Sequence, residues 1–343
     1  MADSFFALSQ KDQREALEYV RAESGRPAHL LEKDIWVVWA LRTLFAAPIG
    51  ADITFKGGTS LSKVYKVIDR FSEDIDVTYD IRKLIPDLVG EGGELPASRS
   101  QAGKWTKAVR HRLPGWITEH IQPVIETAFR EEQLKARVEL GGQENDKLLL
   151  HYPALTKGTG YVAPVVTLEF GGRATGEPHQ IHEVVCDAAG HLPDVIFPTA
   201  SPQVMSLART FWEKATAAHV FCAQGRIRSE RFARHWHDLA AISRSEHLTA
   251  AVTDREVAAA VASHKSHFFI EKDRDGQTID YTVATTGHLK IVPEGDAKAA
   301  LAQDYEAMLA DEVMVGDALT FEELMAACDN LEVMINKHFV TLD

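Results

Sequence analysis

The sequence has few cysteines, no long apolar run and a shortage of positive charge. Of its 343 residues only three are cysteine, and Cys186, Cys222 and Cys328 lie far apart, without the paired spacing of a zinc site. This argues against a disulfide framework and suits a reducing cytoplasm. The longest apolar stretch, IWVVWALRTLFAAPIGA, is interrupted by Arg42 and Pro48, and no basic region precedes an apolar run at the N-terminus. We therefore expect neither export nor a membrane span, and a cytoplasmic protein.

The charge balance is acidic. Lys and Arg number 37 and Asp and Glu number 50, which gives a formal net charge of -13. This excess argues against a protein that coats nucleic acid by bulk electrostatics. Two local basic patches stand against the acidic average: Lys104 to Arg112, and Arg226, Arg228, Arg231 and Arg234. Each can hold an RNA backbone or a triphosphate tail, or can be a solvated helix face.

The order of predicted elements indicates a mixed α/β (α+β) protein with a helical C-terminal part. Hydrophobic periodicity predicts helices over 27–47 and from the Gly57-Gly58 pair to Ile68, with strands at 52–55 and 75–80 on either side of the second helix. A long helical region is expected over 101–133, followed by strands at 136–142, 147–153, 163–172 and 179–187. A helix from an N-cap at Ser201 to a stop at Gly225 opens a series of helices. We expect a first domain over 1–198, including two N-terminal helices, and a helical domain over 199–343.

A glycine pair links the strand at 52–55 to the helix that follows it. In the stretch KGGTSLSKVYKVIDRFSEDIDV, Gly57 and Gly58 let the backbone approach a ligand closely, and the first N–H groups of the helix then face that ligand. Thr59 and Ser60 add hydroxyl donors, and Lys63 lies one turn further along the helix. Such a turn suits a triphosphate, although a bare glycine pair is a weak signal.

The same stretch ends in two aspartates, Asp74 and Asp76, which lie one residue apart at a predicted strand. Their side chains point to the same face of the strand, and two carboxylates held so close repel each other unless a divalent cation lies between them. Mg²⁺ or Mn²⁺, sharing hard oxygen ligands with substrate phosphates, would fit such a site. The alternative is a solvated acidic strand edge. A third carboxylate is available at Glu169, between Leu168 and Phe170, and its alternative role is that of the outward residue of a half-buried strand.

These residues resemble those of a known family. The motif KGGTSLSK…RFSEDIDV, with LEKDIWVVWAL before it and FWEKATAAH and RHWHDLAAI after it, resembles the AbiEii/AbiGii (MenT-like) nucleotidyltransferase toxins of bacterial toxin–antitoxin and phage-defence systems. The resemblance covers nearly the whole chain. It implies a DNA-polymerase-β-like nucleotidyltransferase core with a helical C-terminal domain. The nucleotide and metal residues that it implies, together with those proposed from spacing, are Gly57, Gly58, Thr59, Ser60, Lys63, Ser72, Asp74, Asp76 and Glu169.

Two further site residues are implied by the resemblance in the C-terminal half. Lys214, in FWEK, corresponds to the lysine expected to contact the nucleotide's phosphates, and Asp238, in RHWHDL, corresponds to a later aspartate needed for activity. Without the resemblance Lys214 would be interpreted as a solvated lysine beside an apolar helix face. His235 stands where many members have an acid, which puts a carboxylate-dependent step at that position in doubt. His235 and His237 show no zinc-binding spacing and are expected to pack or cap.

The residues and the resemblance together predict an enzyme that moves a nucleoside monophosphate from an NTP to an acceptor hydroxyl, with loss of pyrophosphate. Asp74 and Asp76 would hold Mg²⁺ and Glu169 would assist deprotonation of the acceptor. The resemblance implies an RNA acceptor, such as a tRNA 3′ end, and a cognate antitoxin as partner. Two alternatives stay open: nucleotidylation of a small molecule or a protein, and a non-catalytic module that binds NTP for regulation.

Overall fold

The computed structural model describes residues 3–72, 74–90, 96–156, 163–225, 232–310, 314 and 318–340. The chain forms two compact units. The first comprises Met1–Val64, Phe71–Gly90 and Lys107–Met205, and the second comprises Tyr65–Arg70, Glu91–Thr106 and Ser206–Asp343. The main change of unit along the chain falls at Ser206, whereas the predicted domain boundary at residue 198 stays a prediction.

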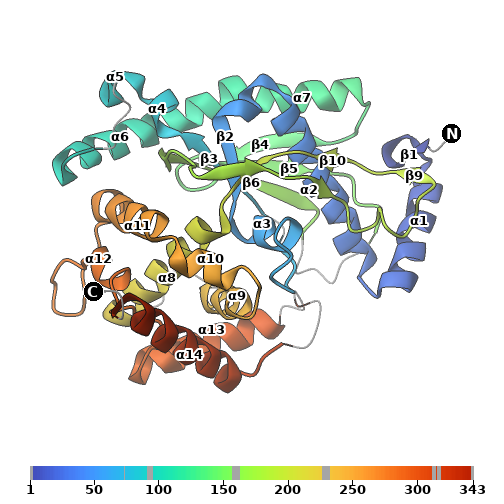
Figure 1. The fold of residues 1–343 in the computed structure, drawn as a ribbon. Helices are drawn as coiled ribbons and strands as arrows, with labels where there is room; N and C mark the ends of the chain where they lie inside the picture. The colour runs from blue at the N-terminus through green and yellow to red at the C-terminus, as the bar shows by residue number, and fades with distance from the viewer. Residues whose placement is uncertain are drawn as a thin grey trace. The chain divides into compact units, whose positions relative to one another are not determined.

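A mixed seven-stranded sheet forms the centre of the first unit (Figure 1). Strand β3 runs antiparallel to β2 and parallel to β6, and β5 runs antiparallel to β6. In sheet order the strands are β4 (Arg137–Gly141), β5 (Lys147–His151), β6 (Val165–Ala174), β3 (Ile75–Asp80), β2 (Ile53–Lys56), β11 (Gln203–Met205) and β7 (His179–Ile181). Two strand pairs lie outside this sheet, β1 (Asp3–Ser4) with β9 (Val195–Ile196), and β8 (Val184–Val185) with β10 (Thr199–Ala200).

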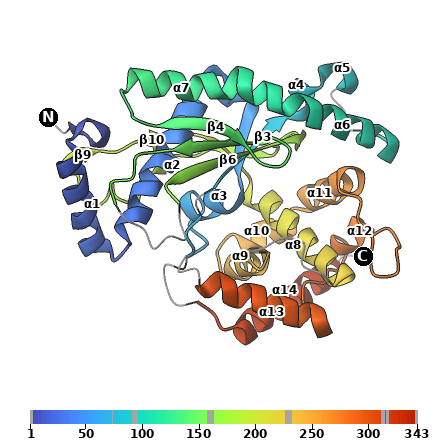
Figure 2. The ribbon, with the colours of Figure 1, turned by 180° about the vertical axis from the view of Figure 1, so that it is seen from behind.

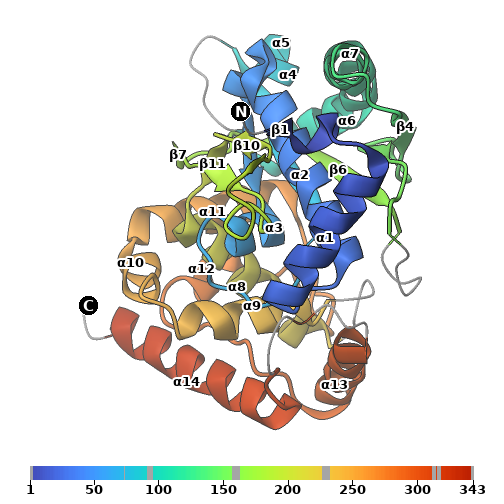
Figure 3. The same cartoon turned by 90° about the vertical axis from the view of Figure 1, so that its right-hand side faces the viewer.

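Helices lie on both sides of this sheet. Helix α7 runs along one side and the short helix α3 lies on the other, as the two opposite views show (Figures 1 and 2). Helix α1 packs beside α2 (Figure 3). The helices are α1 (Gln10–Ser24), α2 (Ala28–Ala46), α3 (Gly57–Lys63), α4 (Ile81–Leu84), α5 (Pro86–Val89), α6 (Arg99–Trp116) and α7 (Gln122–Glu131). The residues of α6 are divided between the two units. A π-helical turn lies at Ile117–Ile121, and 3₁₀ turns lie at Phe5–Ala7 and Pro48–Asp52.

Alternation along β3 separates a buried face from a polar one. Ile75 and Val77 are fully buried, and Tyr79 stacks on Trp116 of α6 with ring centroids 4.0 Å apart. Asp76 therefore points to the opposite face of the sheet. The aromatic packing anchors the strand, so that the position of Asp76 is set by the core behind it.

The second unit is helical. Helix α8 packs against α9 and α11, and α14 packs against α9. Trp212 and Trp236 are fully buried at its centre, and the indole Nε1 of Trp212 donates to the carbonyl of Ala251. The helices are α8 (Leu207–Gln224), α9 (Arg234–Ser243), α10 (Leu248–Thr253), α11 (Arg255–Phe268), α12 (Tyr281–Ala284), α13 (Gly295–Ala310) and α14 (Phe321–Val340). The predicted mixed α/β class, with a helical C-terminal part, is confirmed.

Two predicted helix boundaries are wrong. The helix after the glycine pair ends at Lys63 rather than Ile68, because Lys66 takes a left-handed backbone conformation with φ of 52°. Ser201 does not cap α8, because Gln203–Met205 pairs as strand β11 with β2 and β7. Ser206 is the cap instead, accepting a hydrogen bond from the backbone N–H of Arg209.

Candidate active site

The glycine turn and Asp76 lie against each other. Gly57 has a φ of 80°, and a Cβ added to it would lie only 2.0 Å from Oδ2 of Asp76. The residue before the turn, Lys56, is also the antiparallel partner of Asp76 across β2 and β3. Position 57 therefore requires glycine for two reasons, its left-handed backbone and the carboxylate that occupies the space of a side chain. The predicted turn and the predicted acidic strand meet at this point.

Hydroxyl groups fasten the turn to the start of β3. The Oγ1 of Thr59 donates to the carbonyl of Asp74 at 2.5 Å and lies 3.0 Å from Oγ of Ser72. The Oγ of Ser60 donates to the carbonyl of Gly57 at 2.9 Å. Thr59 and Ser60 are fully buried. In this structure both hydroxyls act within the protein, which argues against their predicted donation to a triphosphate and leaves the backbone N–H groups of the turn for that contact.

The acidic residues lie on two neighbouring strands. Asp76 and Glu169 are direct partners in the parallel pairing of β3 and β6, so their side chains share a face of the sheet. Leu168 and Phe170 are buried on the other face, as expected. Glu169 forms an ion pair with Lys147, with 2.6 Å between Oε2 and Nζ. Burial alone would lower the pKa of Lys147, but Glu169 and, more weakly, Asp74 raise it above its usual value, so this lysine is charged.

The oxygen donors of this site suit a hard cation shared with phosphates. Asp74 and Asp76 lie at the start of β3 beside the turn, and Mg²⁺ is commonly held by one or two carboxylates together with substrate phosphate oxygens. Across the part of the chain that the structure describes, no three His, Cys, Asp or Glu side chains form a group able to hold a metal ion by themselves. Two carboxylates of this kind fit an ion whose remaining ligands include substrate phosphate oxygens. Glu169 as a third metal ligand stays a prediction.

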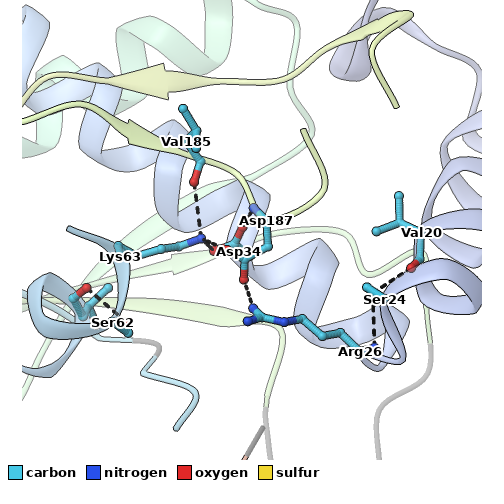
Figure 4. A network of polar contacts seen from close by, with 9 residues as sticks. Val20, Ser24, Arg26, Asp34, Ser62, Lys63, Val185 and Asp187 are labelled. Atoms are coloured by element: carbon cyan, nitrogen blue, oxygen red, sulfur yellow. Dashed lines mark hydrogen bonds and ion pairs between the residues drawn. The ribbon is translucent and has the colours of Figure 1, made fainter. Parts of the chain in front are cut away.

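Lys63 does not face the turn. It is 10% exposed and forms ion pairs with Asp34 of α2 and with Asp187, 2.7 Å away, and its Nζ donates to the carbonyl of Val185 at 3.4 Å (Figure 4). Arg26 binds Asp187 from the other side. Burial alone would lower the pKa of Lys63, but Asp34 and Asp187 raise it above its usual value. This arrangement argues against the predicted contact between Lys63 and a nucleotide; the ammonium instead fixes the last turn of α3.

The predicted residues Lys214 and Asp238 meet in the second unit. Asp238 is fully buried, accepts two hydrogen bonds of 2.8 Å from Arg70, pairs with Nζ of Lys214 at 2.8 Å, and lies 3.1 Å from Nδ1 of His237. Burial alone would raise the pKa of Asp238, yet Arg70 and Lys214 hold it well below its usual value. Asp238 is thus a permanent carboxylate whose oxygens are used inside the protein. Lys214 is 11% exposed and is the cation at the margin of this cluster.

His235 supplies no acid to this cluster. Burial, with a smaller contribution from the nearby charge of Lys214, lowers the pKa of His235 to about 3, so that the imidazole is neutral at physiological pH.

The second basic patch falls mostly on Arg226, Arg228 and Arg231, which lie outside the described residues.

The first basic patch carries acidic partners. Arg110 pairs with Glu144 at 3.2 Å and Arg112 pairs with Asp87 at 2.5 Å. These two charges are therefore partly neutralised, which favours the alternative of a surface helix face for this patch.

Three residues of the site were missed in the sequence. Arg70 lies inside the motif, but its partner Asp238 is 168 residues away. Lys147 joins Glu169 only through the order of the strands in the sheet. Asp34 belongs to the charged run Glu32-Lys33-Asp34 within a mostly apolar helix, and all three side chains are buried. This buried charged triplet was the one sequence signal that pointed to Asp34.

A glycine turn packed against an acidic strand is the layout of a nucleotidyl-transfer site, and the chain is a nucleotidyltransferase. It matches the family described as "Nucleotidyl transferase AbiEii toxin, Type IV TA system" over residues 39–327, and therefore belongs to the AbiEii family of toxin nucleotidyltransferases. The resemblance seen in the sequence is thereby confirmed. Enzymes of this class use an NTP and a divalent metal ion, and toxins of such systems have an antitoxin partner.

Solved structures similar to this chain include three bacterial proteins. MenT4, a nucleotidyltransferase toxin of Mycobacterium tuberculosis, is 15% identical, with 98% of this chain and 99% of that chain covered and a TM-score of 0.43. A protein described as a putative nucleotidyltransferase of Helicobacter pylori is 13% identical, with coverages of 93% and 99% and a TM-score of 0.43. JHP933 of Helicobacter pylori is 13% identical, with coverages of 90% and 91% and a TM-score of 0.40. No curated protein matches the sequence. Of the described helices, none is long and apolar enough to cross a membrane.

Proposed function

We propose that this toxin transfers a nucleoside monophosphate from an NTP to a hydroxyl of an RNA acceptor, such as a tRNA 3′ end, in a reaction that depends on Mg²⁺ or Mn²⁺. The acceptor oxygen attacks the α-phosphorus, a new P–O bond forms, the bond to the β-phosphate oxygen breaks and pyrophosphate leaves. Growth arrest, within a toxin–antitoxin or phage-defence system, would follow from the modified RNA. The antitoxin would hold the activity in check.

The observation that supports this proposal is the contact between the turn and Asp76. A carboxylate beside a glycine turn places an oxygen ligand next to the backbone N–H groups that would receive the triphosphate. Asp74 and Asp76 would hold the metal ion, which would neutralise the phosphates and steady the leaving pyrophosphate. Gly58, together with Gly57, would let the phosphates approach the backbone. Glu169, on the same face, would accept the proton of the acceptor hydroxyl.

Lys214 and Asp238 take different roles in this proposal. Lys214 would contact the phosphates of the nucleotide, as the family resemblance implies. Asp238 is fully buried beneath Arg70 and Lys214, so it would act by holding Lys214 rather than by touching substrate. Ser72 would act in the same indirect way, since its hydroxyl lies against Thr59.

The test is incubation of the purified protein with each of four α-³²P-labelled NTPs, Mg²⁺ and total bacterial RNA. We expect labelled RNA with the wild type and a loss of at least about 100-fold with Asp74→Asn or Lys214→Ala, since each removes a group that stabilises developing charge. Asp194→Asn, at an exposed position of the first unit, removes the same formal charge and should leave the rate unchanged. Folded wild type that labels no RNA would refute the acceptor.

The same assay distinguishes the proposed function from two alternative functions. Nucleotidylation of a protein or a small molecule would yield labelled protein or a small labelled product in place of labelled RNA. A non-catalytic NTP-binding module would retain its biological effect after Asp74→Ala, whereas the catalytic proposal requires that this substitution abolish both transfer and toxicity.

A further inference from the structure

Four charged residues form a row across four strands of the sheet. Lys56 of β2 pairs with Asp76 of β3, Asp76 pairs with Glu169 of β6, and Glu169 pairs with Lys147 of β5. Direct partners in a sheet share a face, and strands lie about 4.8 Å apart, so the row spans about 14 Å. Its order is positive, negative, negative, positive. The glycine turn adjoins Lys56 and Asp76 at one end, and Lys147 is the cation at the other end.

The ion pair of Lys147 is easily exchanged. Its side chain is 35% exposed and that of Glu169 is 45% exposed, and an ion pair at such an exposed position contributes about 0–1 kcal/mol. Lys63 offers the contrast, since it is 10% exposed and is held by two carboxylates. A phosphodiester, with one negative charge shared by two oxygens, would therefore compete with Glu169 for Lys147 far more readily than with the two carboxylate partners of Lys63.

The β4–β5 hairpin is shaped around the stem of Lys147. Gly142 has a φ of 85°, and a Cβ added there would lie 3.1 Å from Cγ of Lys147 and 2.4 Å from Oδ1 of Asp146. The carbonyl of Asp146 accepts a hydrogen bond of 2.9 Å from the backbone N–H of Phe170, which ties the hairpin to β6 beside Glu169. The lysine is thus held at this end of the row by its backbone and its aliphatic stem, independently of the ion pair.

We infer that Lys147 binds a phosphate group of the acceptor strand. The inference rests on the proposed function and names the residue that receives the acceptor. With the triphosphate at the glycine turn, the acceptor hydroxyl would approach from the side of Glu169 that faces away from the turn, where Lys147 follows Glu169 in the row. When Lys147 turns to a phosphodiester of the acceptor, its ion pair with Glu169 breaks and the Glu169 carboxylate becomes available to the acceptor hydroxyl. The acceptor is thereby specified as a phosphodiester chain rather than a neutral hydroxyl compound.

The experiment measures binding of a fluorescently labelled single-stranded RNA that ends in a 3′-deoxynucleotide, so that no transfer takes place. Anisotropy titrations at several salt concentrations compare wild type, Lys147→Met, Lys147→Arg and Lys135→Met, the last an exposed lysine of the same unit. We expect Lys147→Met to weaken binding about tenfold and to lower the slope of log K against log salt by about 0.7, the share of one phosphate contact on a single strand. Lys147→Arg and Lys135→Met should bind as the wild type does.

A second measurement assigns the loss to the acceptor. Lys147→Met should leave the KM for NTP within about twofold of wild type, while the KM for RNA rises about tenfold. Unchanged RNA binding, or an equal loss of affinity for NTP, would overturn the inference. Wild type that binds the RNA through Lys147 but labels nothing would refute the proposed function alone. Wild type that labels RNA, with RNA affinity and the KM for RNA unchanged by Lys147→Met, would refute the inference alone.

Discussion

Replacement of Gly57 by alanine tests whether Asp76 must lie against the glycine turn. The added Cβ would begin 2.0 Å from Oδ2 of Asp76, so the carboxylate or the turn must move by about 1.4 Å to reach the 3.4 Å of ordinary contact. A displacement of about 1 Å at a reacting centre can lower a rate about 100-fold. We therefore expect Gly57→Ala to lower nucleotidyl transfer at least that much, with little change in RNA affinity.

Gly25 supplies the matched control. Its φ is 73°, close to that of Gly57, but a Cβ added to it would have no neighbour within 4 Å. Both alanine variants therefore carry the same left-handed backbone strain, about 1–2 kcal/mol, and only one of them displaces Asp76. Transfer rates are compared at equal folded fraction, with thermal melts of each variant. If Gly57→Ala and Gly25→Ala transfer at rates within threefold of each other, Asp76 does not need its place beside the turn and the proposed site is wrong.

Three other predictions concern buried ionisable side chains. Asp238→Asn leaves Arg70 and Lys214 without their carboxylate and should destabilise the protein by about 3–5 kcal/mol. The control Asp329→Asn, at an exposed position, should shift the melting temperature by less than about 1 °C. Equal melting temperatures for the two variants would contradict the assigned burial of Asp238. Lys63→Met should destabilise the protein by a similar ~3–5 kcal/mol, and the double variant with Asp34→Asn should recover part of that stability. A loss of NTP binding at unchanged stability would instead support the predicted contact between Lys63 and the nucleotide. Burial lowers the pKa of His219 to about 4 from 6.5, so stability should fall by up to about 3 kcal/mol as the pH drops from 6.5 to 4, and denaturant titrations of His219→Asn should show a smaller fall.

The unfolded chain binds a proton at His219 more readily than the folded chain does. Between pH 6.5 and 4 the unfolded chain protonates His219 while the folded chain does not, so protons favour unfolding. In the folded state Nδ1 of His219 accepts a hydrogen bond of 3.0 Å from the backbone N–H of Lys290, and this acceptor is lost when the ring is protonated there. An asparagine oxygen can accept the same bond without titrating. His235, whose pKa is lowered to about 3, contributes a fall of the same sign that remains in the variant.

The local half of the site could be predicted from the sequence. Gly57, Asp74 and Asp76 lie within one strand–turn–helix–strand unit, and residue types with strict backbone or charge requirements show themselves at short spacing. Most strands of the sheet that carries them were also expected, because β-branched and aliphatic runs bounded by turn residues indicate strands. The prediction of helix boundaries failed in two places. The hydrophobic pattern continues past Lys66, although the left-handed backbone there ends the helix, and Gln203–Met205 forms a strand where a helix was expected to begin.

The remaining part depended on partners far away in the sequence. The direction of Lys63 was decided by Asp187, 124 residues later, and the helix spacing alone placed that lysine toward a ligand. Lys147 entered the site because β5 lies next to β6 in the sheet, and strand order cannot be deduced from hydrophobic alternation. Asp238 was expected to be needed for activity, and only its contacts with Arg70 and Lys214 reveal that its oxygens are already in use within the protein.

The contact between Gly57 and Asp76 also makes these two positions sterically interdependent. Shortening residue 76 to alanine would remove the proposed metal ligand and at the same time open a small void beside the turn, without touching the buried face of β3. Such a variant would keep the aromatic packing behind the strand and lose only the reactive end. If the proposed function holds, it would serve as a folded, inactive form of the toxin with which to capture the antitoxin or the proposed RNA acceptor in living cells. Among relatives, loss of the acid at 76 should be accompanied by a relaxed steric requirement at 57, which would mark copies that have given up catalysis.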